Sequence, residues 1–370
     1  MKSGHYEKFG ENTHFVPSPL PESIELDSEL LELYGEAMNS LGKLAEAQKK
    51  IPSKRQFLDV YIAKEAIFSS QIENINTTLT QVLEHKSQTK PENKDVQEVL
   101  NYIAALHHGS RMLNNNLPIS SRLIKECHKV LLSGVRGESK TPGSYRKVPV
   151  FVGSLVPPPA HYIENLSTDL EKFVNTNNGI LPLIKTGLAH VQFETIHPFL
   201  DGNGRIGRLL IVLMLMDYGL IHESVLYPSF FFMRYKSEYY DRLDGVRTKG
   251  DYVGWIKYFL RGIKASANDV VMRTWAIDEL LEDCTKKIET NLSKAFHKNA
   301  DILLFQLCDT PVVSIGTVAE LLKCTFTTAE KLVGNFIAIG ILEQQERKKL
   351  RNKTYYFKRY LDILEKDFVG

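Results

Sequence analysis

Apolar residues recur every three or four positions along most of this chain, which is the spacing of one face of an α-helix. Between residues 26 and 48 they are Leu30, Leu31, Leu33, Tyr34, Met38, Leu41, Leu44 and Ala47. The same spacing returns over residues 57–75, 96–112, 119–132, 161–174, 184–196 and 239–260. Residues 209–216 are apolar throughout and predict a buried helix or strand. The pattern therefore predicts a mainly α protein.

Two stretches break the helical spacing. Residues 1–22 are rich in Pro, Ser and Asn, and they predict an extended arm. Residues 134–159 are dense in Gly and Pro, and within them residues 147–152 predict one strand of a small hairpin that turns at Gly153. An ordinary surface loop is the alternative, and Pro149 allows an edge strand at most.

The C-terminal part has a different order of elements. Residues 266–298 predict a long helix, and three short helices are expected over residues 302–308, 315–322 and 327–339. Gly340 is a good helix stop, and strands are expected at residues 341–342 and 354–357. This order resembles a winged helix-turn-helix. Its wing, residues 343–359, has seven Lys or Arg against two Glu. That charge suits phosphate contact and equally suits a solvated hairpin, so DNA binding stays an alternative to protein contact.

Composition sets outer bounds on what the chain can be. A length of 370 residues suggests two or three domains, and 43% hydrophobic and 24% charged residues are ordinary for a globular protein. A net charge of +2 creates no global field that would imply nucleic acid or membrane. Residues 1–14 lack the apolar segment of a secretory signal, and the apolar run 209–216 is too short to cross a membrane. Because the four cysteines show no C-x-x-C spacing, we expect free thiols and a cytoplasmic protein.

The densest chemistry lies in residues 197–208, HPFLDGNGRIGR, between two apolar elements. This stretch holds a titratable base (His197), a carboxylate (Asp201), three glycines and two arginines (Arg205 and Arg208). A glycine-rich helix start offers backbone N–H groups to a phosphate. Asp-Gly and Asn-Gly alone would be turn chemistry, and the Gly-Lys-Ser/Thr ending of a P-loop is absent from the stretch. Turn chemistry does not explain the base, the carboxylate and both arginines together.

The whole stretch resembles the signature of the Fic family, HPFx(D/E)GNGRxxR, and fits it at every defined position. The resemblance implies a Fic-type helical bundle with a small β-hairpin flap, and transfer of AMP from ATP to a protein hydroxyl with release of pyrophosphate. In that reaction His197 would be the general base and Asp201 would hold Mg²⁺. The nucleotide would be held by Gly202, Asn203, Gly204, Arg205 and Arg208. The resemblance continues to Tyr239 and Tyr240, which could stack on an adenine, although aromatic residues at helical spacing more often form core.

A second stretch, residues 69–74, bears on the same reaction. Ser69 and Glu73 lie four residues apart and would share one face of a helix. Alone, Glu73 would be a solvated acidic residue. Beside the signature, Ser69, Glu73 and Asn74 resemble the family's inhibitory motif, (S/T)xxxE(G/N), whose glutamate pairs with the last arginine of the signature, here Arg208. An arginine held by a carboxylate cannot also bind a γ-phosphate.

The hairpin expected near Gly153 corresponds in the family to a flap that aligns a segment of the target protein by strand addition. The residues that would dock the target are Val148, Val150, Phe151 and Val152.

These observations predict an autoinhibited protein adenylyltransferase that acts on Ser, Thr or Tyr of an unidentified target, and also on itself. The alternatives are an enzyme that also removes AMP, with Glu73 activating water, a different nucleotide-linked donor, and a DNA-binding regulator. A homodimer is expected from the family. We expect an N-terminal region with the inhibitory helix (1–90), a Fic domain (91–265), a helical linker (266–298) and a winged-helix domain (299–370).

Overall fold

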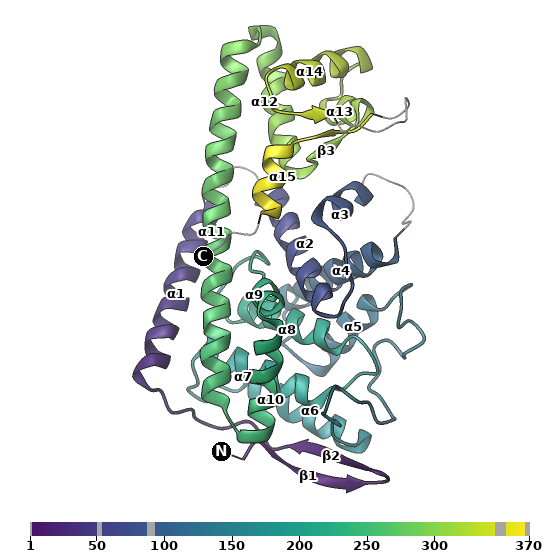
Figure 1. Ribbon diagram of the computed structural model, residues 1–370, viewed down its shortest axis with the longest axis vertical. Helices are drawn as coiled ribbons and strands as arrows, with labels where there is room; N and C mark the ends of the chain where they lie inside the picture. Colours follow the sequence, from purple (N-terminus) through teal and green to yellow (C-terminus); the bar gives the residue numbers. More distant parts are fainter. Residues whose placement is uncertain (1, 50–53, 87–92, 345–352, 367–370) are drawn as a thin grey trace. The chain divides into compact units, whose positions relative to one another are not determined.

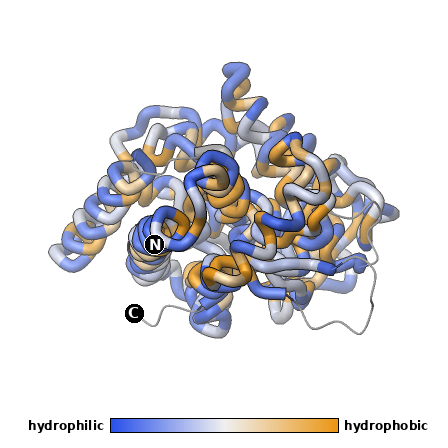
Figure 2. Tube along the Cα trace, turned by 90° about the horizontal axis from the view of Figure 1, so that it is seen from above, coloured by the Kyte–Doolittle hydropathy of each residue, from blue (hydrophilic) through white to orange (hydrophobic). Residues whose placement is uncertain are grey.

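The computed structural model describes residues 2–49, 54–86, 93–344 and 353–366 (Figure 1). The chain forms two compact units. The first comprises Met1–Gly42, Ile62–Thr77 and Asn93–Ala267, and the second comprises Lys43–Tyr61, Thr78–Glu92 and Asn268–Gly370. The described residues are mainly helical, as predicted. Figure 2 shows hydrophilic and hydrophobic residues alternating along the helices, which is the pattern of helices with one buried face.

The first unit is built around two helices that are buried almost throughout their length. Its complete helices are α4 (Lys94–Asn114), α5 (Ser121–Leu131), α6 (Ile163–Asn175), α7 (Pro182–Ile196), α8 (Asn203–Asp217), α9 (Ser229–Arg234) and α10 (Lys236–Lys249). Three more helices, α1 (Ser28–Lys49), α2 (Lys54–Ile72) and α11 (Tyr252–Asn291), have residues in both units. α7 is buried from Leu183 to Ile196, and it packs on α6 and α8. The apolar run 209–216 lies in the buried helix α8, so the helical alternative is confirmed.

The prediction of an extended N-terminal arm is wrong for residues 4–17. They form an antiparallel hairpin of β1 (Gly4–Phe9) and β2 (Asn12–Pro17), closed by a two-residue turn in which Gly10 has φ +62°. β2 also joins residues 156 and 157, because the Phe15 N–H donates to the Val156 carbonyl at 2.9 Å and His14 Nδ1 lies 2.6 Å from the Pro157 carbonyl. These long-range bonds, which local composition does not reveal, favour a hairpin over an extended arm.

The hairpin expected near Gly153 is present in a minimal form. Val152 and Leu155 exchange two backbone hydrogen bonds of 2.9 Å around a turn in which Gly153 has φ +57°. The expected strand does not extend back to residue 147, since residues 147–151 have no assigned strand. Val148 and Phe151 are 53% and 64% exposed, and Val150 and Val152 are half-buried. The strand is short in agreement with Pro149, which has no backbone N–H to donate to a strand ladder.

The second unit contains the predicted C-terminal elements. They are α12 (Lys294–Asp309), β3 (Val312–Val313), α13 (Ile315–Leu322), α14 (Phe326–Ala338), β4 (Glu343–Gln344), β5 (Tyr355–Tyr356) and α15 (Lys358–Glu365), together with α3 (Leu79–Lys86). The three expected helices are confirmed, and α12 begins earlier than predicted. The strands form an antiparallel sheet of order β3-β5-β4. The central part of the predicted wing, residues 345–352, lies outside the described residues.

Among the described residues, none of the helices combines the length and the apolar character that crossing a membrane requires.

Candidate active site

The signature loop joins two helices that are deeply buried. α7 ends at Ile196, and His197 follows in the left-handed conformation with φ +48°. α8 begins at Asn203 after Gly202, whose φ of +74° is also left-handed. Glycine adopts this conformation without steric cost, whereas His197 must be held there by its surroundings. Hydrogen bonds from Asn203, His128 and Arg146 to the loop backbone supply that constraint.

Asn203 ties the loop to itself. Its side-chain oxygen accepts the Phe199 N–H at 2.8 Å, and its side-chain nitrogen donates to the Phe199 carbonyl at 2.9 Å. Both polar ends of the amide are therefore used within the loop. What Asn203 can offer an anion is its backbone N–H, which belongs to the first turn of α8 together with those of Gly204 and Arg205. These first N–H groups have no acceptor within a helix, so they are able to bind a phosphate.

His128, on α5, holds the other side of the loop. Its ring stacks on Phe199 with centroids 3.7 Å apart and planes 8° from parallel. The Gly143 N–H donates to Nδ1 at 2.8 Å, so Nε2 carries the proton and donates to the Asp201 carbonyl at 2.9 Å. Burial lowers the pKa of His128 to about 4, which keeps this neutral tautomer at physiological pH. The sequence interpretation missed this residue.

Arg146 caps the end of α7. Its guanidinium donates to the carbonyls of His197 at 2.8 Å, Pro158 at 2.7 Å, Val148 at 3.2 Å and Ile196 at 3.4 Å. A cation suits the negative end of a helix dipole. Burial lowers the pKa of Arg146 to about 10, a value at which the side chain stays charged at neutral pH. The part of Arg146 in bracing the loop was not predicted from the sequence.

His197 has the protonation state of a general base. Its Nδ1 lies 3.3 Å from the Glu194 carbonyl, an acceptor, so Nδ1 carries the proton and Nε2 keeps a free lone pair in the neutral ring. Burial lowers the pKa of His197 to about 4, and the Arg146 charge acts in the same direction. The imidazole is therefore neutral, and able to accept a proton, throughout the physiological pH range.

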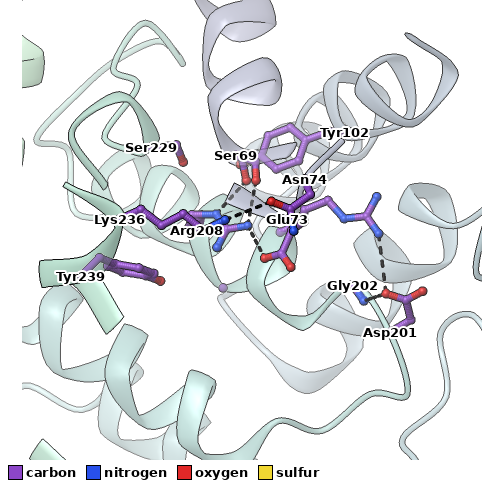
Figure 3. Close-up of polar contacts among 12 residues, drawn as sticks. Ser69, Glu73, Asn74, Tyr102, Asp201, Gly202, Arg208, Ser229, Lys236 and Tyr239 are labelled. Atoms are coloured by element: carbon purple, nitrogen blue, oxygen red, sulfur yellow. Dashed lines mark hydrogen bonds and ion pairs between the residues drawn. The ribbon is translucent and has the colours of Figure 1, made fainter. Parts of the chain in front are cut away.

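Arg208, the last arginine of the signature, is held through Nε and Nη2 by residues 69–74, the stretch that resembles the inhibitory motif (Figure 3). Its Nε donates to Ser69 Oγ at 2.9 Å, and its Nη2 donates to the Ser69 carbonyl at 2.9 Å and to Glu73 Oε1 at 2.8 Å. The Arg208 side chain is 1% exposed and that of Glu73 is 36% exposed. The structure thus brings Ser69, Glu73 and Arg208 together in the pairing expected from the sequence.

The Glu73 carboxylate also lies over the first turn of α8. A Cβ added to Gly204 would stand 2.3 Å from Glu73 Oε1, so no side chain at position 204 fits beside this carboxylate. The position suits an anion, because the N-terminus of a helix carries positive partial charge. Burial alone would raise the pKa of Glu73, but the charge of Arg208 outweighs it and holds that pKa below its ordinary value. Glu73 is therefore an ionised carboxylate in the place predicted for a phosphate.

Asn74 explains the last position of the inhibitory motif. α2 ends at Ile72, and Asn74 has φ +61°. The left-handed region is open to glycine and, among other residues, most readily to asparagine. Asn74 thereby turns the chain so that Glu73, just before it, faces Arg208.

Arg205 is held by a partner that the sequence interpretation missed. Its Nη1 donates to Glu98 Oε2 at 2.7 Å, and both side chains are 2% exposed. Its Nη2 lies 3.8 Å from Asp201 Oδ1. Glu98 lies four residues before the buried Tyr102 on α4, so it shares the apolar face of that helix, and this placement was a usable signal. The structure commits the fork of Arg205 to Glu98, so its predicted phosphate contact stays a prediction.

Asp201 has one carboxylate oxygen engaged by the loop itself. Its Oδ1 accepts the Gly202 N–H at 2.6 Å, and its side chain is 36% exposed. No group of three metal-ligating side chains occurs among the described residues. Mg²⁺ commonly binds one or two carboxylates and completes its shell with water and substrate phosphate oxygens, so a lone half-exposed aspartate fits that ion.

The two tyrosines predicted for an adenine pocket lie in different environments. Tyr239 is 1% exposed, its hydroxyl lies 2.8 Å from His190 Nε2, and its ring stacks on Phe232, which places it in the core. Tyr240 is 41% exposed and contacts the ring of Tyr239 at 5.3 Å between centroids. Burial raises the pKa of Tyr240 to about 12, and the charges of Glu73 and Arg208 also act on it. Of the pair, Tyr240 is the one whose ring is open to a ligand.

Two buried carboxyls lie close enough to feel the charge of Arg208. Glu65 accepts from the Tyr102 hydroxyl at 3.0 Å and the Ser229 hydroxyl at 2.5 Å, whereas Glu194 Oε1 has no hydrogen-bond partner among the described residues. Burial raises the pKa of each to about 7. Neither was predicted from the sequence.

The fold and the loop together define a helical protein with a candidate anion site at the N-terminus of α8. Residues 31–111 match the model of the Fic/DOC family N-terminal domain, and residues 118–215 match the model of the Fic/DOC family. These two segments are therefore similar to the two domains described for the Fic/DOC family.

Proteins of similar sequence carry the name protein adenylyltransferase Fic. The chain is 29% identical to the one from Drosophila grimshawi over 262 residues, and 28% identical to the one from Aedes aegypti over 264 residues. Each match covers 69% of this chain and 50% of the relative. The chain thus spans about half the length of these curated relatives.

Solved structures share the fold. A Fic family protein from Desulfovibrio desulfuricans G20 superposes with a TM-score of 0.58 at 20% identity, covering 90% of this chain and 97% of that one. A fragment of Fic-1 from C. elegans superposes with a TM-score of 0.54 at 20% identity, covering 68% of this chain and 74% of that one. At these identities the likeness establishes the fold alone.

Proposed function

We propose that this chain is an autoinhibited protein adenylyltransferase, which transfers AMP from ATP to a hydroxyl of a target protein. The observation that carries the proposal is the bond of 2.8 Å between Glu73 Oε1 and Arg208 Nη2. It places an ionised carboxylate on the signature arginine, over the helix N-terminus that would receive a phosphate. The names of the relatives agree with this chemistry.

The chemical step follows from the protonation state of His197. Its Nε2 would take the proton of a Ser, Thr or Tyr hydroxyl while the hydroxyl oxygen attacks the α-phosphorus. A new O–P bond forms, the bond from the α-phosphorus to the bridging oxygen breaks, and pyrophosphate leaves. The N–H groups of Asn203 and Gly204 would stabilise charge on the phosphates. Arg146 and His128 contribute by fixing the loop backbone, not by touching substrate.

Magnesium would be held by Asp201. The ion would neutralise charge on the phosphates and on the leaving pyrophosphate. The flap residues Val148 and Phe151 are exposed beside the loop that Arg146 braces, which suits docking of an extended target segment.

Inhibition would arise because Glu73 occupies the position of a phosphate and also binds Arg208, the side chain that would bind that phosphate. The Arg208 nitrogens Nε and Nη2 are engaged by Ser69 and Glu73, and the carboxylate stands against Gly204. ATP bound without Arg208 would have its phosphates displaced. Misplacement of about 1 Å can cost on the order of a hundredfold in rate.

The proposal predicts that Glu73→Gly strongly increases AMP transfer. Protein incubated with Mg²⁺ and each nucleoside triphosphate is examined by intact-mass spectrometry, and ATP should add the mass of one AMP to the chain or to a target. We expect a gain on the order of a hundredfold over the unsubstituted chain. Glu73→Gly combined with His197→Ala is the control and should show no transfer. Transfer that survives loss of His197 would refute the mechanism.

We further propose that the C-terminal elements form a winged helix-turn-helix that contacts protein. The order α12-β3-α13-α14-β4-β5 and the sheet order β3-β5-β4 support this architecture. The exposed positions of α14 include Phe326, Ile337, Glu330 and Lys331, so this face is apolar with balanced charge. Helices that read DNA need a positive and polar face instead.

A further inference from the structure

A second cation lies at the inhibitory stretch. Lys236 is the first residue of α10, and its Nζ donates to Asn74 Oδ1 at 3.2 Å. Figure 3 shows the Lys236 side chain reaching Asn74 while Arg208 reaches Glu73, the residue before it. The sequence interpretation did not single out Lys236.

The placement of Lys236 is electrostatically unfavourable in the inhibited protein. The N-terminus of a helix carries positive partial charge, so a lysine there is repelled where a carboxylate would be favoured. Among the described residues, the hydrogen bond of Lys236 goes to a neutral amide, which does not compensate the charge. Its partner Asn74 directly follows Glu73, whose carboxylate holds Arg208 at 2.8 Å. An additional anion at this point would relieve the repulsion between Lys236 and the helix N-terminus.

The inhibitory stretch occupies both cations through consecutive residues. Glu73 holds Arg208 and Asn74 holds Lys236, so any displacement that withdraws Glu73 carries Asn74 along the same short segment. The two cations would therefore be released together. Tyr240 lies one helical turn after Lys236 on α10, on the same face, and is exposed. α10 thus presents a cation and an aromatic ring toward the place that Glu73 leaves.

We propose that Lys236 is a further triphosphate-binding residue, masked by Asn74 as Arg208 is masked by Glu73. This inference rests on the proposed function. Lys236 contributes a positive charge to the β- and γ-phosphates and makes no contact with the α-phosphate. It therefore strengthens the binding of ATP and not that of AMP. As a flexible point charge it needs no fixed fork geometry, which suits a group that moves between two partners.

Calorimetric titration of ATP and of AMP, each with Mg²⁺, into Glu73→Gly protein tests the inference. Adding Lys236→Met should weaken ATP binding about tenfold, the usual worth of one charge-assisted hydrogen bond, and leave AMP binding within about twofold. Lys236→Arg should restore most of the ATP affinity because it keeps the charge. Lys249→Met is the matched control: it removes an equal charge from the other end of α10 and should change neither affinity.

Two results would overturn the inference about Lys236 and leave the proposed function intact. They are an ATP affinity that Lys236→Met leaves unchanged, and equal weakening of ATP and AMP, which would indicate a general disturbance of the site. A thermal unfolding scan of each variant separates loss of binding from loss of folding. Failure of the proposed function looks different: Glu73→Gly would then bind ATP no better than the unsubstituted chain, and the inference would fall with it.

Discussion

At the scale of single residues, the site depends on side chains that never meet a substrate. Asn203, His128 and Arg146 together bind the backbone of the loop at Phe199, Asp201 and His197. Their hydrogen bonds compensate the left-handed conformation of His197 and fix the direction of its imidazole. Because these partners come from different helices and from the 143–158 segment, no local sequence pattern could identify them as one group. The candidate base His197, by contrast, could be predicted from the signature.

Glu194 gives the site a pH-dependent contribution to stability. Its pKa is raised by burial from an ordinary 4.5 to about 7 in the folded protein. Because the pKa is raised, the folded protein binds the Glu194 proton more tightly than the unfolded chain does. The contribution of Glu194 to folding stability is therefore complete below pH 4.5 and is lost as the pH rises through 7. Glu194→Gln, which cannot ionise, should therefore gain stability relative to the unsubstituted chain between pH 5 and 8. The gain should be at most about 1.4 kcal/mol per pH unit.

Urea unfolding of both proteins at several pH values measures this difference. Glu65 titrates in both proteins with the same sign, so its contribution cancels in the comparison. Unfolding free energies that stay parallel from pH 5 to 8 would contradict a buried, proton-binding Glu194.

At the scale of elements, the position of Glu73 depends on how α2 ends. The helix stops at Ile72, and the left-handed Asn74 directs Glu73 toward α8. The motif was recognisable from the sequence because the glutamate is followed by an asparagine, a residue that readily adopts the left-handed conformation. The partner Glu98 of Arg205 was less visible, since the local sequence does not distinguish it from Asp95, the half-buried carboxylate on the same helix. Local chemistry predicts helix ends, whereas pairing between helices depends on packing.

The backbone at Asn74 should therefore control inhibition separately from its side chain. Asn74→Ala and Asn74→Gly both remove the bond to Lys236, but the alanine Cβ costs about 1 kcal/mol or more in the left-handed region. We expect Asn74→Ala to transfer AMP about fivefold faster than Asn74→Gly, because strain favours release of Glu73. Labelled-ATP transfer assays compare the two variants. Equal rates would mean that the turn does not hold the glutamate in place.

At the scale of the whole molecule, every residue placed in the site belongs to the first of the two units. The helical class, the buried pair α7 and α8, and the C-terminal order of elements were all predictable from apolar spacing and helix stops. The N-terminal hairpin was not, since its stability depends on bonds from β2 to residues 156 and 157, far away in the sequence. The strand expected over residues 147–152 is reduced to the pair of Val152 with Leu155, in agreement with the missing N–H of Pro149.

The balanced charge of α14 leads to a prediction for the second unit. Fluorescence anisotropy with a random-sequence DNA duplex measures this. A protein that makes several phosphate contacts loses on the order of a thousandfold in DNA affinity between 50 and 200 mM salt. The full chain should show no such salt-sensitive binding. Lys331→Glu, which adds negative charge to the exposed face of α14, should change nothing. Salt-sensitive binding that Lys331→Glu abolishes would establish α14 as a DNA-contacting helix.

The position of Glu73 over Gly204 has a thermodynamic consequence. In the proposed function, Glu73 stands where a phosphate would bind, so it acts as a tethered competitor of the nucleotide. The apparent dissociation constant for ATP then equals the intrinsic one divided by the fraction of molecules in which Glu73 is withdrawn. Such a protein has no absolute off state, because its activity rises with nucleotide concentration. Any partner that binds the withdrawn state increases nucleotide affinity and, by linkage, is bound more tightly when nucleotide is present.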